Sequence, residues 1–211
     1  MSTLKTIYLQ HLNGANTNAT LDANGNMTVT GTVCGASSNM FRNRIINGNM
    51  AIDQRNAGAS VTPTATNYTV DRWRFPTNIS SKITVQQQAI ASPQSCENNR
   101  YTLSCSTASA YTVGAGEYFG INQFVEGYNM ADLGWGTSVA KAVTLSFWVY
   151  CGLTGTFGGA IRTGDGSNYS YPFTYSIGSA NTWTQISITI AGPTAGSWNT
   201  GSTGFVWVNF S

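Results

Sequence analysis

The amino-acid sequence predicts an all-β protein: a two-sheet antiparallel jelly-roll sandwich preceded by a small strand-bearing N-terminal segment. About ten runs place apolar side chains at every second position, at a spacing of roughly eight to fifteen residues. There is no convincing amphipathic helix. Only 9% of the residues are charged and 23 are glycine, which suits short strands joined by neutral turns. Two packed antiparallel sheets accommodate so many short strands, and strand number and length favour a jelly roll over an immunoglobulin topology.

Residues 141–150 form the clearest strand and are interpreted as central to the sandwich. Their side chains divide between two faces, with Val143, Leu145, Phe147 and Val149 on one and Thr144, Ser146, Trp148 and Tyr150 on the other. Strand geometry sends successive side chains to opposite faces, so this run can bury four apolar groups and present a mixed polar and aromatic face.

The remaining strands are predicted from the same alternation. In chain order the candidates are residues 5–12, 27–30, 43–52, 68–75, 83–86, 101–105, 118–125, 156–162, 169–177, 183–190 and 204–210. Within the run 169–177, Pro172 cannot donate a ladder hydrogen bond, which predicts that this strand lies at a sheet edge or a bulge.

Residues 1–38 differ in kind from the rest of the chain. They contain strand and turn signals but too few large apolar residues to bury a core alone. Such a segment either stays mobile or orders against something else, and its regular strand signals favour ordering against copies of itself or a docking surface. Residues 35–38 are expected to form a linker. The predicted organisation is an N-terminal anchoring and oligomerisation segment, 1–38, followed by a β-sandwich, 39–211.

Composition excludes several classes of function. A net charge of +2 without a basic run argues against nucleic-acid binding. No apolar stretch is long enough to cross a membrane, and residues 1–12 lack the features of a signal peptide, so we predict synthesis in a cytoplasm and no membrane insertion. Four cysteines without CxxC spacing and a single histidine offer no metal quartet.

The sequence also lacks the motifs of hydrolases, metalloproteases and nucleotide-binding enzymes. Glu126 and Asp132 lie within one loop-like stretch and could pair as glycosidase carboxylates do, although solvated or turn-capping acids are the commoner case. We therefore predict that the protein is not an enzyme, and no catalytic residue is assigned.

Several stretches of the main domain are distinctive when they are taken together: residues 43–55, 68–75, 125–136, 143–149, 180–186 and 190–198. Together they resemble a domain common in bacteriophage tail-fibre and other virion appendage proteins, one that is itself similar to jelly-roll carbohydrate-binding modules. The resemblance covers roughly residues 43–211, and residues 1–5 of the chain also look like the start of such proteins.

One departure from the family pattern concerns the last strand. The family continues with further strands after the region that corresponds to residues 204–210, whereas this chain stops at Ser211. An apolar strand at that position would leave a sheet edge that needs cover. Either a partner subunit supplies the cover, or the natural product is longer.

A binding function requires aromatic and polar side chains on one surface. Sugar rings lie with their C–H faces on aromatic rings, and their hydroxyls bond to amides and guanidinium groups, to which Asn122 and Gln123 could contribute. Most large aromatic residues in a sandwich fill its core, so each one is a candidate only. The candidate glycan-binding residues are Trp148, Tyr150, Tyr169, Tyr171 and Trp207.

Charged residues near the start of the domain have two possible roles. Modules of this shape often hold a structural Ca²⁺ with carboxylate oxygens, so Asp53 and Asp71 are weak candidates for metal ligands. Asp71, Arg72 and Arg74 are more simply interpreted as a structural ion pair or turn bracket around Trp73.

The resemblance implies a structural virion protein, assembled in the host cytoplasm, most simply a phage tail fibre. Its N-terminal segment would attach to other virion proteins, of the tail or the capsid, and assemble a homotrimer. Its jelly roll would bind a host surface polysaccharide, and no cofactor is expected. The alternatives are a head fibre, a capsid decoration or cement protein without ligand, and a polysaccharide depolymerase.

Overall fold

The computed structural model describes residues 43–91, 99–107, 110–164, 169–202 and 205–210, together with three short strands near the N-terminus. The chain divides into two compact units, Met1–Asn43 and Arg44–Ser211. The predicted linker at residues 35–38, and with it the predicted domain boundary, lies outside the described residues.

The first unit contains one antiparallel sheet with the order β1-β2-β3. Its strands are β1 (Tyr8–Leu9), β2 (Ala19–Leu21) and β3 (Met27–Val29). β1 and β3 fall within the runs predicted at residues 5–12 and 27–30, whereas the alternation did not indicate β2.

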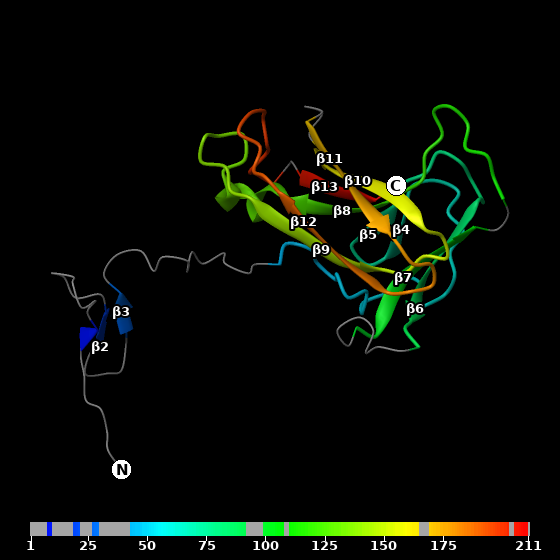
Figure 1. The fold of residues 1–211 in the computed structure, drawn as a ribbon, viewed down its shortest axis with the longest axis horizontal. Coiled ribbons are helices and arrows are strands. Elements are labelled where there is room, and N and C mark those ends of the chain that lie inside the picture. Colours follow the sequence, from blue (N-terminus) through cyan, green and yellow to red (C-terminus); the bar gives the residue numbers. More distant parts are fainter. Residues whose placement is uncertain are drawn as a thin grey trace, which may run out of the picture. The chain divides into compact units, whose positions relative to one another are not determined.

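The second unit is built on a six-stranded antiparallel sheet with the order β11-β10-β13-β8-β5-β4 (Figure 1). Its strands, in that order, are β11 (Ser170–Ile177), β10 (Gly155–Thr163), β13 (Phe205–Phe210), β8 (Ile121–Glu126), β5 (Trp73–Phe75) and β4 (Asn67–Val70). β11, which contains Pro172, lies at the edge of this sheet, and this confirms the prediction made from that residue.

A second layer consists of two strand pairs. β9 (Val143–Val149) pairs with β12 (Thr184–Ile190), and β6 (Ile83–Ala89) pairs with β7 (Tyr101–Thr107). Between β8 and β9 the chain forms two short 3-10 turns, η2 (Gly127–Asn129) and η3 (Ala131–Leu133). These turns are the described helical elements, and none is long and apolar enough to span a membrane.

The two layers pack through the side chains that the alternation assigned to one face. The Phe147 ring on β9 lies 5.1 Å from that of Tyr175 on β11 and 4.9 Å from that of Phe210 on β13, both edge-on. Ile190 on β12 is fully buried in the same apolar cluster as Val125 of β8. The predicted all-β antiparallel sandwich is therefore confirmed.

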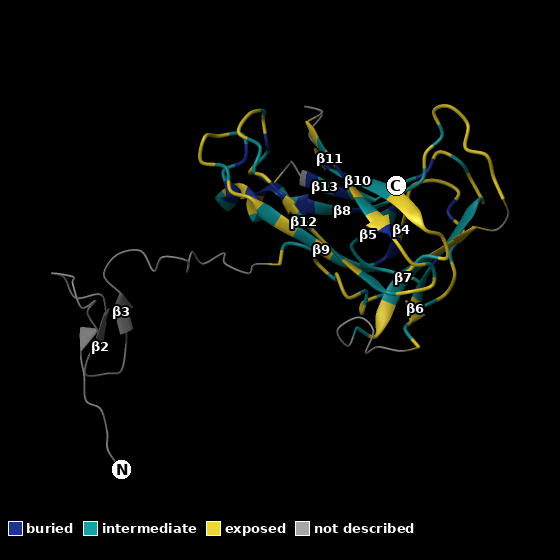
Figure 2. Ribbon diagram, viewed as in Figure 1, coloured by how far each residue is buried: buried dark blue, intermediate teal, exposed yellow. Residues whose placement is uncertain are grey.

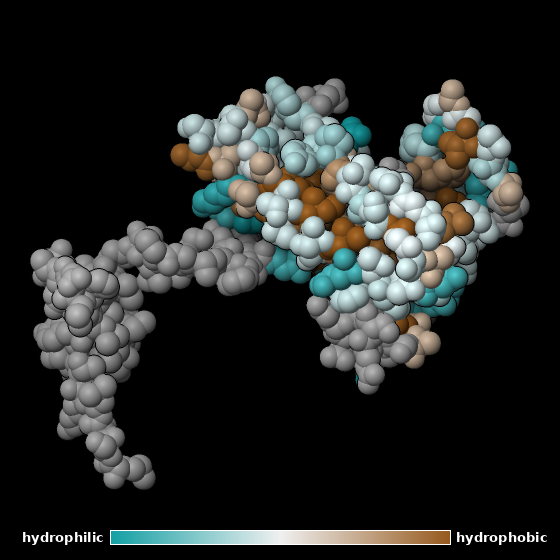
Figure 3. All heavy atoms as spheres, in the orientation of Figure 1, coloured by the Kyte–Doolittle hydropathy of each residue, from teal (hydrophilic) through white to brown (hydrophobic). Residues whose placement is uncertain are grey.

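The position of β9 differs from the expectation. It was predicted as the central strand, but in the described part of the chain it pairs with β12 alone, and β13 and β8 occupy the middle of the larger sheet. Its inward residues Val143, Leu145 and Phe147 are only partly buried. Figure 3 accordingly shows apolar surface between paler atoms over β9 and β12.

The larger sheet has an inner face toward β9 and β12 and an outer face away from them. On β13, Val206 and Val208 point inward and are buried, so Trp207 and Asn209 point outward. On β8, Val125 points inward, so Asn122 and Phe124 point outward. Figure 2 shows that buried residues concentrate along the middle strands. The outer face is where the candidate site lies.

Candidate functional site

The five predicted glycan-binding aromatics lie in three different places. Tyr171 lies on the inward side of β11 with Tyr169 directly before that strand, Trp148 and Tyr150 lie on the outward side of β9, and Trp207 lies on the outer face of the larger sheet. They therefore do not form one surface. The sequence placed them correctly in or beside strands but could not tell which faces would meet.

Tyr171 is used in packing, whereas Tyr169, directly before β11, is exposed. Tyr171 lies opposite Ile161 and packs against the apolar cluster. The ring of Tyr169 is partly exposed, and a Cβ added at Gly196 would come within 2.9 Å of it. The Tyr169 backbone is held to Thr163 by hydrogen bonds of 2.9 and 3.2 Å.

Trp148 and Tyr150 lie on the opposite surface of the domain, outside the second layer. Tyr150 is half exposed, and its ring centroid lies 5.5 Å from that of Trp183. Trp148 lies opposite Gln185 and is partly covered, with its indole Nε1 out of contact with solvent. Trp148 and Tyr150 thus belong to a smaller and less polar group of side chains than the one around Trp207.

Trp207 is the middle of a continuous row of rings and guanidinium groups across the larger sheet. Its cross-strand partners are Phe124 on β8 and Arg162 on β10. The Trp207 and Phe124 ring centroids lie 5.0 Å apart with a tilt of 36°. The Arg162 guanidinium lies 4.8 Å from the Trp207 ring centroid, which is within cation–π range.

The row continues onto β5 and β4. The Arg74 guanidinium lies 4.2 Å from the Phe124 ring centroid and 5.8 Å from that of Tyr68. Arg74 and Tyr68 are themselves cross-strand partners. We refer to Arg162, Trp207, Phe124, Arg74 and Tyr68 as the ladder. Its members come from five neighbouring strands, and all five are at least partly exposed, so the ladder is reachable by a ligand.

Two asparagines lie side by side next to the ladder. Asn122 and Asn209 are cross-strand partners on β8 and β13, and Asn122 also lies opposite Arg74. Asn122 is only 1% exposed, yet neither its Oδ1 nor its Nδ2 has a hydrogen-bond partner among the described residues, and the same is true of Asn209 Nδ2. Buried amides without a protein partner are uncommon, and a water, an ion or a ligand can satisfy them.

Gln123, the other amide predicted as a binding residue, has a different role. It points inward and is fully buried, where its Oε1 accepts the Ile46 N–H and its Nε2 donates to the Ile46 carbonyl, both at 2.8 Å. It therefore fastens the segment before β4 onto the sheet and is not available to a ligand.

The arginines around the ladder differ in their partners. Arg72 donates to Glu126 at 2.6 Å, and Arg55 lies 3.6 Å from the carboxylate of Asp71. These pairs agree with the interpretation of this region as a structural ion-pair bracket. Arg74 does not take part in it: within the described ranges, the contacts of its guanidinium are the two ring contacts above.

Glu126 and Asp132, the carboxylates that could have served a glycosidase, are both held in ion pairs. The Arg44 guanidinium donates to both Asp132 oxygens, at 2.8 and 2.6 Å, and also contacts the carbonyl of Asn129. Burial would raise the pKa of Glu126, but the hydrogen bond and charge of Arg72 outweigh it and hold that pKa below its usual value. A general acid would need the opposite shift.

Asp53 and Asp71 have partners of their own. The Asp53 carboxylate accepts the N–H groups of Asn56 and Gly58, at 3.2 and 2.8 Å, and so shapes a turn. Asp71 accepts the Gln54 N–H at 2.5 Å. Across the described residues no three His, Cys, Asp or Glu side chains gather as a metal-binding group. This donor set does not fit Ca²⁺, which takes about six to eight oxygen ligands.

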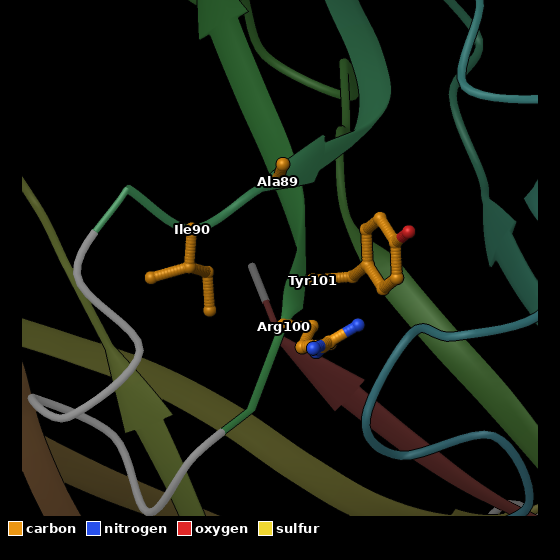
Figure 4. A pocket seen from close by; sticks show the side chains of 4 residues that line it. All are labelled: Ala89, Ile90, Arg100 and Tyr101. Carbon is orange, nitrogen blue, oxygen red and sulfur yellow. The ribbon is translucent and has the colours of Figure 1, made fainter.

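Two hollows of the surface lie away from the ladder. One, of about 330 Å³, lies at the end of the β6–β7 pair (Figure 4) and is lined by Ala89, Ile90, Arg100 and Tyr101. A second, of about 160 Å³, lies beside Tyr111 and Phe119. Neither is lined by a ladder residue. The ladder side chains themselves lie across five strands on one sheet face and are at least partly exposed, an arrangement that suits an extended ligand better than a small enclosed one.

Sequence reasoning identified two members of this site, Trp207 and Asn122, and missed the others. Phe124, Asn209 and Arg162 carry no signal of their own, because a single aromatic, amide or arginine in a strand is unremarkable. What makes them a group is the pairing of β8, β10 and β13, which places residues from distant parts of the chain opposite one another.

No family model matches the chain, and no curated protein matches its sequence. Among solved structures, the chain is distantly similar to the enzymatically active domain of tailspike protein 4 from bacteriophage CBA120. The similarity has a TM-score of 0.34 and 13% sequence identity, and it covers 80% of this chain and 19% of the tailspike chain. The chain thus spans about a fifth of the tailspike's length. At this level the likeness does not assign a family, an activity or a ligand.

This finding corrects the prediction that the protein is not an enzyme. That prediction rested on the absence of known catalytic motifs, and the solved structure that the chain resembles is a domain with enzymatic activity. Motif absence is a weak argument in such proteins, because two carboxylates brought together by the fold need no local signature. The distant likeness does not transfer the tailspike's activity to this chain.

Proposed function

We propose that the protein is a structural component of a phage tail appendage, of the tail-fibre type, and that it binds host cell-surface glycan on the outer face of the six-stranded sheet. The observation that supports this proposal is the ladder together with its neighbour Asn122, whose buried amide has no hydrogen-bond partner within the described residues. The resemblance of residues 43–211 to virion appendage domains agrees with it.

The chemistry of the ladder suits a sugar chain. The rings of Trp207 and Phe124 offer adjacent apolar surfaces for the C–H faces of pyranose rings, and their tilt of 36° forms a shallow saddle. The amides of Asn122 and Asn209 offer donors and acceptors for hydroxyl groups. The Arg74 guanidinium lies over the Phe124 ring, so we expect it to move aside when a ligand reaches Asn122.

Attachment to the particle is assigned to the N-terminal segment, residues 1–38, which we propose to assemble a homotrimer and to dock on other virion proteins. Three linked sandwiches would multiply a weak single-site affinity, because linkage raises the effective concentration of the second and third site. Light scattering after gel filtration of the full chain tests this part, with an expected mass three times the 22.5 kDa of one chain. A monomeric mass would refute the trimer.

Glycan binding is tested on an array of bacterial surface polysaccharides with the full chain. Trp207→Ala should reduce binding more than about tenfold, as expected for an aromatic at the centre of an interface. The matched control is Tyr128→Ala, an aromatic with 68% exposure outside the ladder, which should bind as the wild type does. Melting temperatures verify that both variants are folded.

The outcomes separate the proposed function from its alternatives. If the wild type binds glycan and only Trp207→Ala loses it, the ladder is the binding site. If both variants bind equally well, the site is elsewhere and the proposal for the ladder is wrong. If the wild type binds no polysaccharide, a cement or decoration protein is favoured, and labelling the protein on intact particles then distinguishes head from tail.

A further inference from the structure

We infer that the ladder recognises an acidic glycan, one whose sugar units carry carboxylate or other anionic groups. This inference rests on the proposed function and adds the class of ligand. It is carried by two guanidinium groups, those of Arg74 and Arg162, which lie at either side of the Trp207–Phe124 ring pair.

Among the arginines of the larger sheet that the structure describes, Arg74 and Arg162 have no carboxylate partner, whereas Arg72 does. Arg44, Arg55 and Arg72 each have a carboxylate partner within 4 Å, at 2.6, 3.6 and 2.6 Å respectively. In the part of the chain that the structure describes, Arg74 and Arg162 have ring contacts but no hydrogen bond or ion pair. Within the described ranges, their positive charges therefore have no carboxylate partner, and both side chains are at least partly exposed.

The ring contacts hold these guanidinium groups in a useful arrangement. A guanidinium over an aromatic ring keeps its N–H groups available for an incoming anion, and its flat fork matches the two oxygens of a carboxylate. Because Arg162 is already confined by Trp207, less conformational entropy is lost at this residue when a ligand binds, whereas Arg74 is expected to move off the Phe124 ring. A lysine on a flexible stem would not be confined in this way.

The separation of the two arginines indicates a repeating ligand. Arg162 is on β10 and Arg74 on β5, with β13 and β8 between them. Neighbouring strands lie about 4.8 Å apart, so the two side chains originate roughly 14 Å apart. A single sugar ring cannot bridge this distance, whereas a short stretch of an acidic polysaccharide can place one charge at each arginine and its rings on the aromatics between them.

The buried amides beside the row agree with such a ligand. Asn122 lies opposite both Arg74 and Asn209, and three of the four polar atoms of this amide pair lack partners among the described residues. Movement of the Arg74 side chain onto a ligand carboxylate would uncover Asn122 for a neighbouring hydroxyl. Arg74 would then bind a carboxylate of the ligand at the same time as Asn122 binds a neighbouring hydroxyl.

The experiment compares acidic with neutral polysaccharides and uses the full chain. The acidic probes are polygalacturonate, hyaluronate and polysialic acid, and the neutral probes are dextran and mannan, all within a wider array of bacterial polysaccharides. Each acidic polysaccharide that binds is tested again after its carboxylates have been reduced to alcohols. We expect binding to acidic members, loss of binding after reduction, and weaker binding as the salt concentration rises.

Variants locate the effect. Arg74→Gln and Arg162→Gln should each weaken binding about tenfold to a hundredfold, the range expected for the loss of a charge-assisted hydrogen bond. The matched control is Arg100→Gln, which removes the same charge from an exposed position on the β6–β7 pair and should leave affinity unchanged. Circular dichroism and melting temperature establish that the three variants are folded.

The results distinguish failure of this inference from failure of the proposed function. Binding to neutral polysaccharides alone, or binding that survives carboxylate reduction and both arginine substitutions, overturns the acidic ligand but leaves glycan binding in place. If all three arginine variants lose the same amount of affinity for acidic polysaccharide, binding depends only on the net charge of the protein, and the inference is also overturned. Absence of binding to every polysaccharide overturns both.

Discussion

Two adjacent amides on β8 should respond in opposite directions to the same substitution. Asn122→Leu is expected to stabilise the protein, and Gln123→Leu is expected to destabilise it. Both residues are buried, with exposures of 1% and 0%, so neither change alters the surface much. They differ in their hydrogen bonds: Gln123 has two bonds to Ile46, and Asn122 has none from either polar atom within the described residues.

The magnitudes follow from these contacts. Replacing Gln123 removes its two hydrogen bonds to the backbone of Ile46, and each typically contributes about 0.5–1.5 kcal/mol. Replacing Asn122 removes two polar atoms that are already desolvated without compensation, which should increase the free energy of unfolding by about 1–3 kcal/mol. In a protein of this size, each kcal/mol corresponds to a shift of about 2–4 °C in melting temperature.

The assay is urea and thermal unfolding of both variants in parallel, followed by glycan binding of Asn122→Leu. We expect a higher midpoint and a lower glycan affinity for Asn122→Leu, the pattern of a residue kept for binding at a cost in stability. A loss of stability in Asn122→Leu similar to that in Gln123→Leu would refute the reasoning. It would mean that the Asn122 amide is satisfied in solution, and the argument that it awaits a ligand would fall.

Three further outcomes are expected. Gly159→Ala should lower the melting temperature, because the added Cβ would lie within 2.4 Å of the Asn209 carbonyl and 2.5 Å of the Phe173 ring, whereas Gly178→Ala, with open space around it, should not. Asp132→Asn should lower the free energy of unfolding by about 1–3 kcal/mol, measured by urea denaturation, since it breaks the bidentate pair with the partly buried Arg44. Glu126 has a depressed pKa in the folded state, so its ionised form stabilises the fold above the ordinary glutamate value near 4.5, and this contribution is lost as the pH falls through the lower folded value. Glu126→Gln should therefore show a smaller loss of stability on acidification than the wild type, and identical pH profiles would contradict the role of Arg72.

The sequence alone determined the fold class, because burial and alternation are local properties of a strand. Runs such as 143–149 and 206–210 show which side chains share a face, and these faces are the ones buried between the layers. The edge position of β11 was equally local, since Pro172 lacks a donor wherever it is placed. Strand β9 was misjudged as central because a regular pattern says nothing about how many neighbours a strand has.

The candidate site was decided by the tertiary structure. Alternation could assign Trp207 to one face of its strand, but not whether that face would meet another sheet or solvent. The same ambiguity placed Tyr171, which packs against the apolar cluster, among the binding candidates. The cross-strand partners of Trp207 are Arg162 and Phe124, which precede it in the sequence by 45 and 83 positions. Only the order of the strands in the sheet places these residues opposite Trp207. The hydrogen bonds between strands are made by backbone groups and do not depend on which side chains the strands carry. The order of the strands is therefore a property of the whole folded domain.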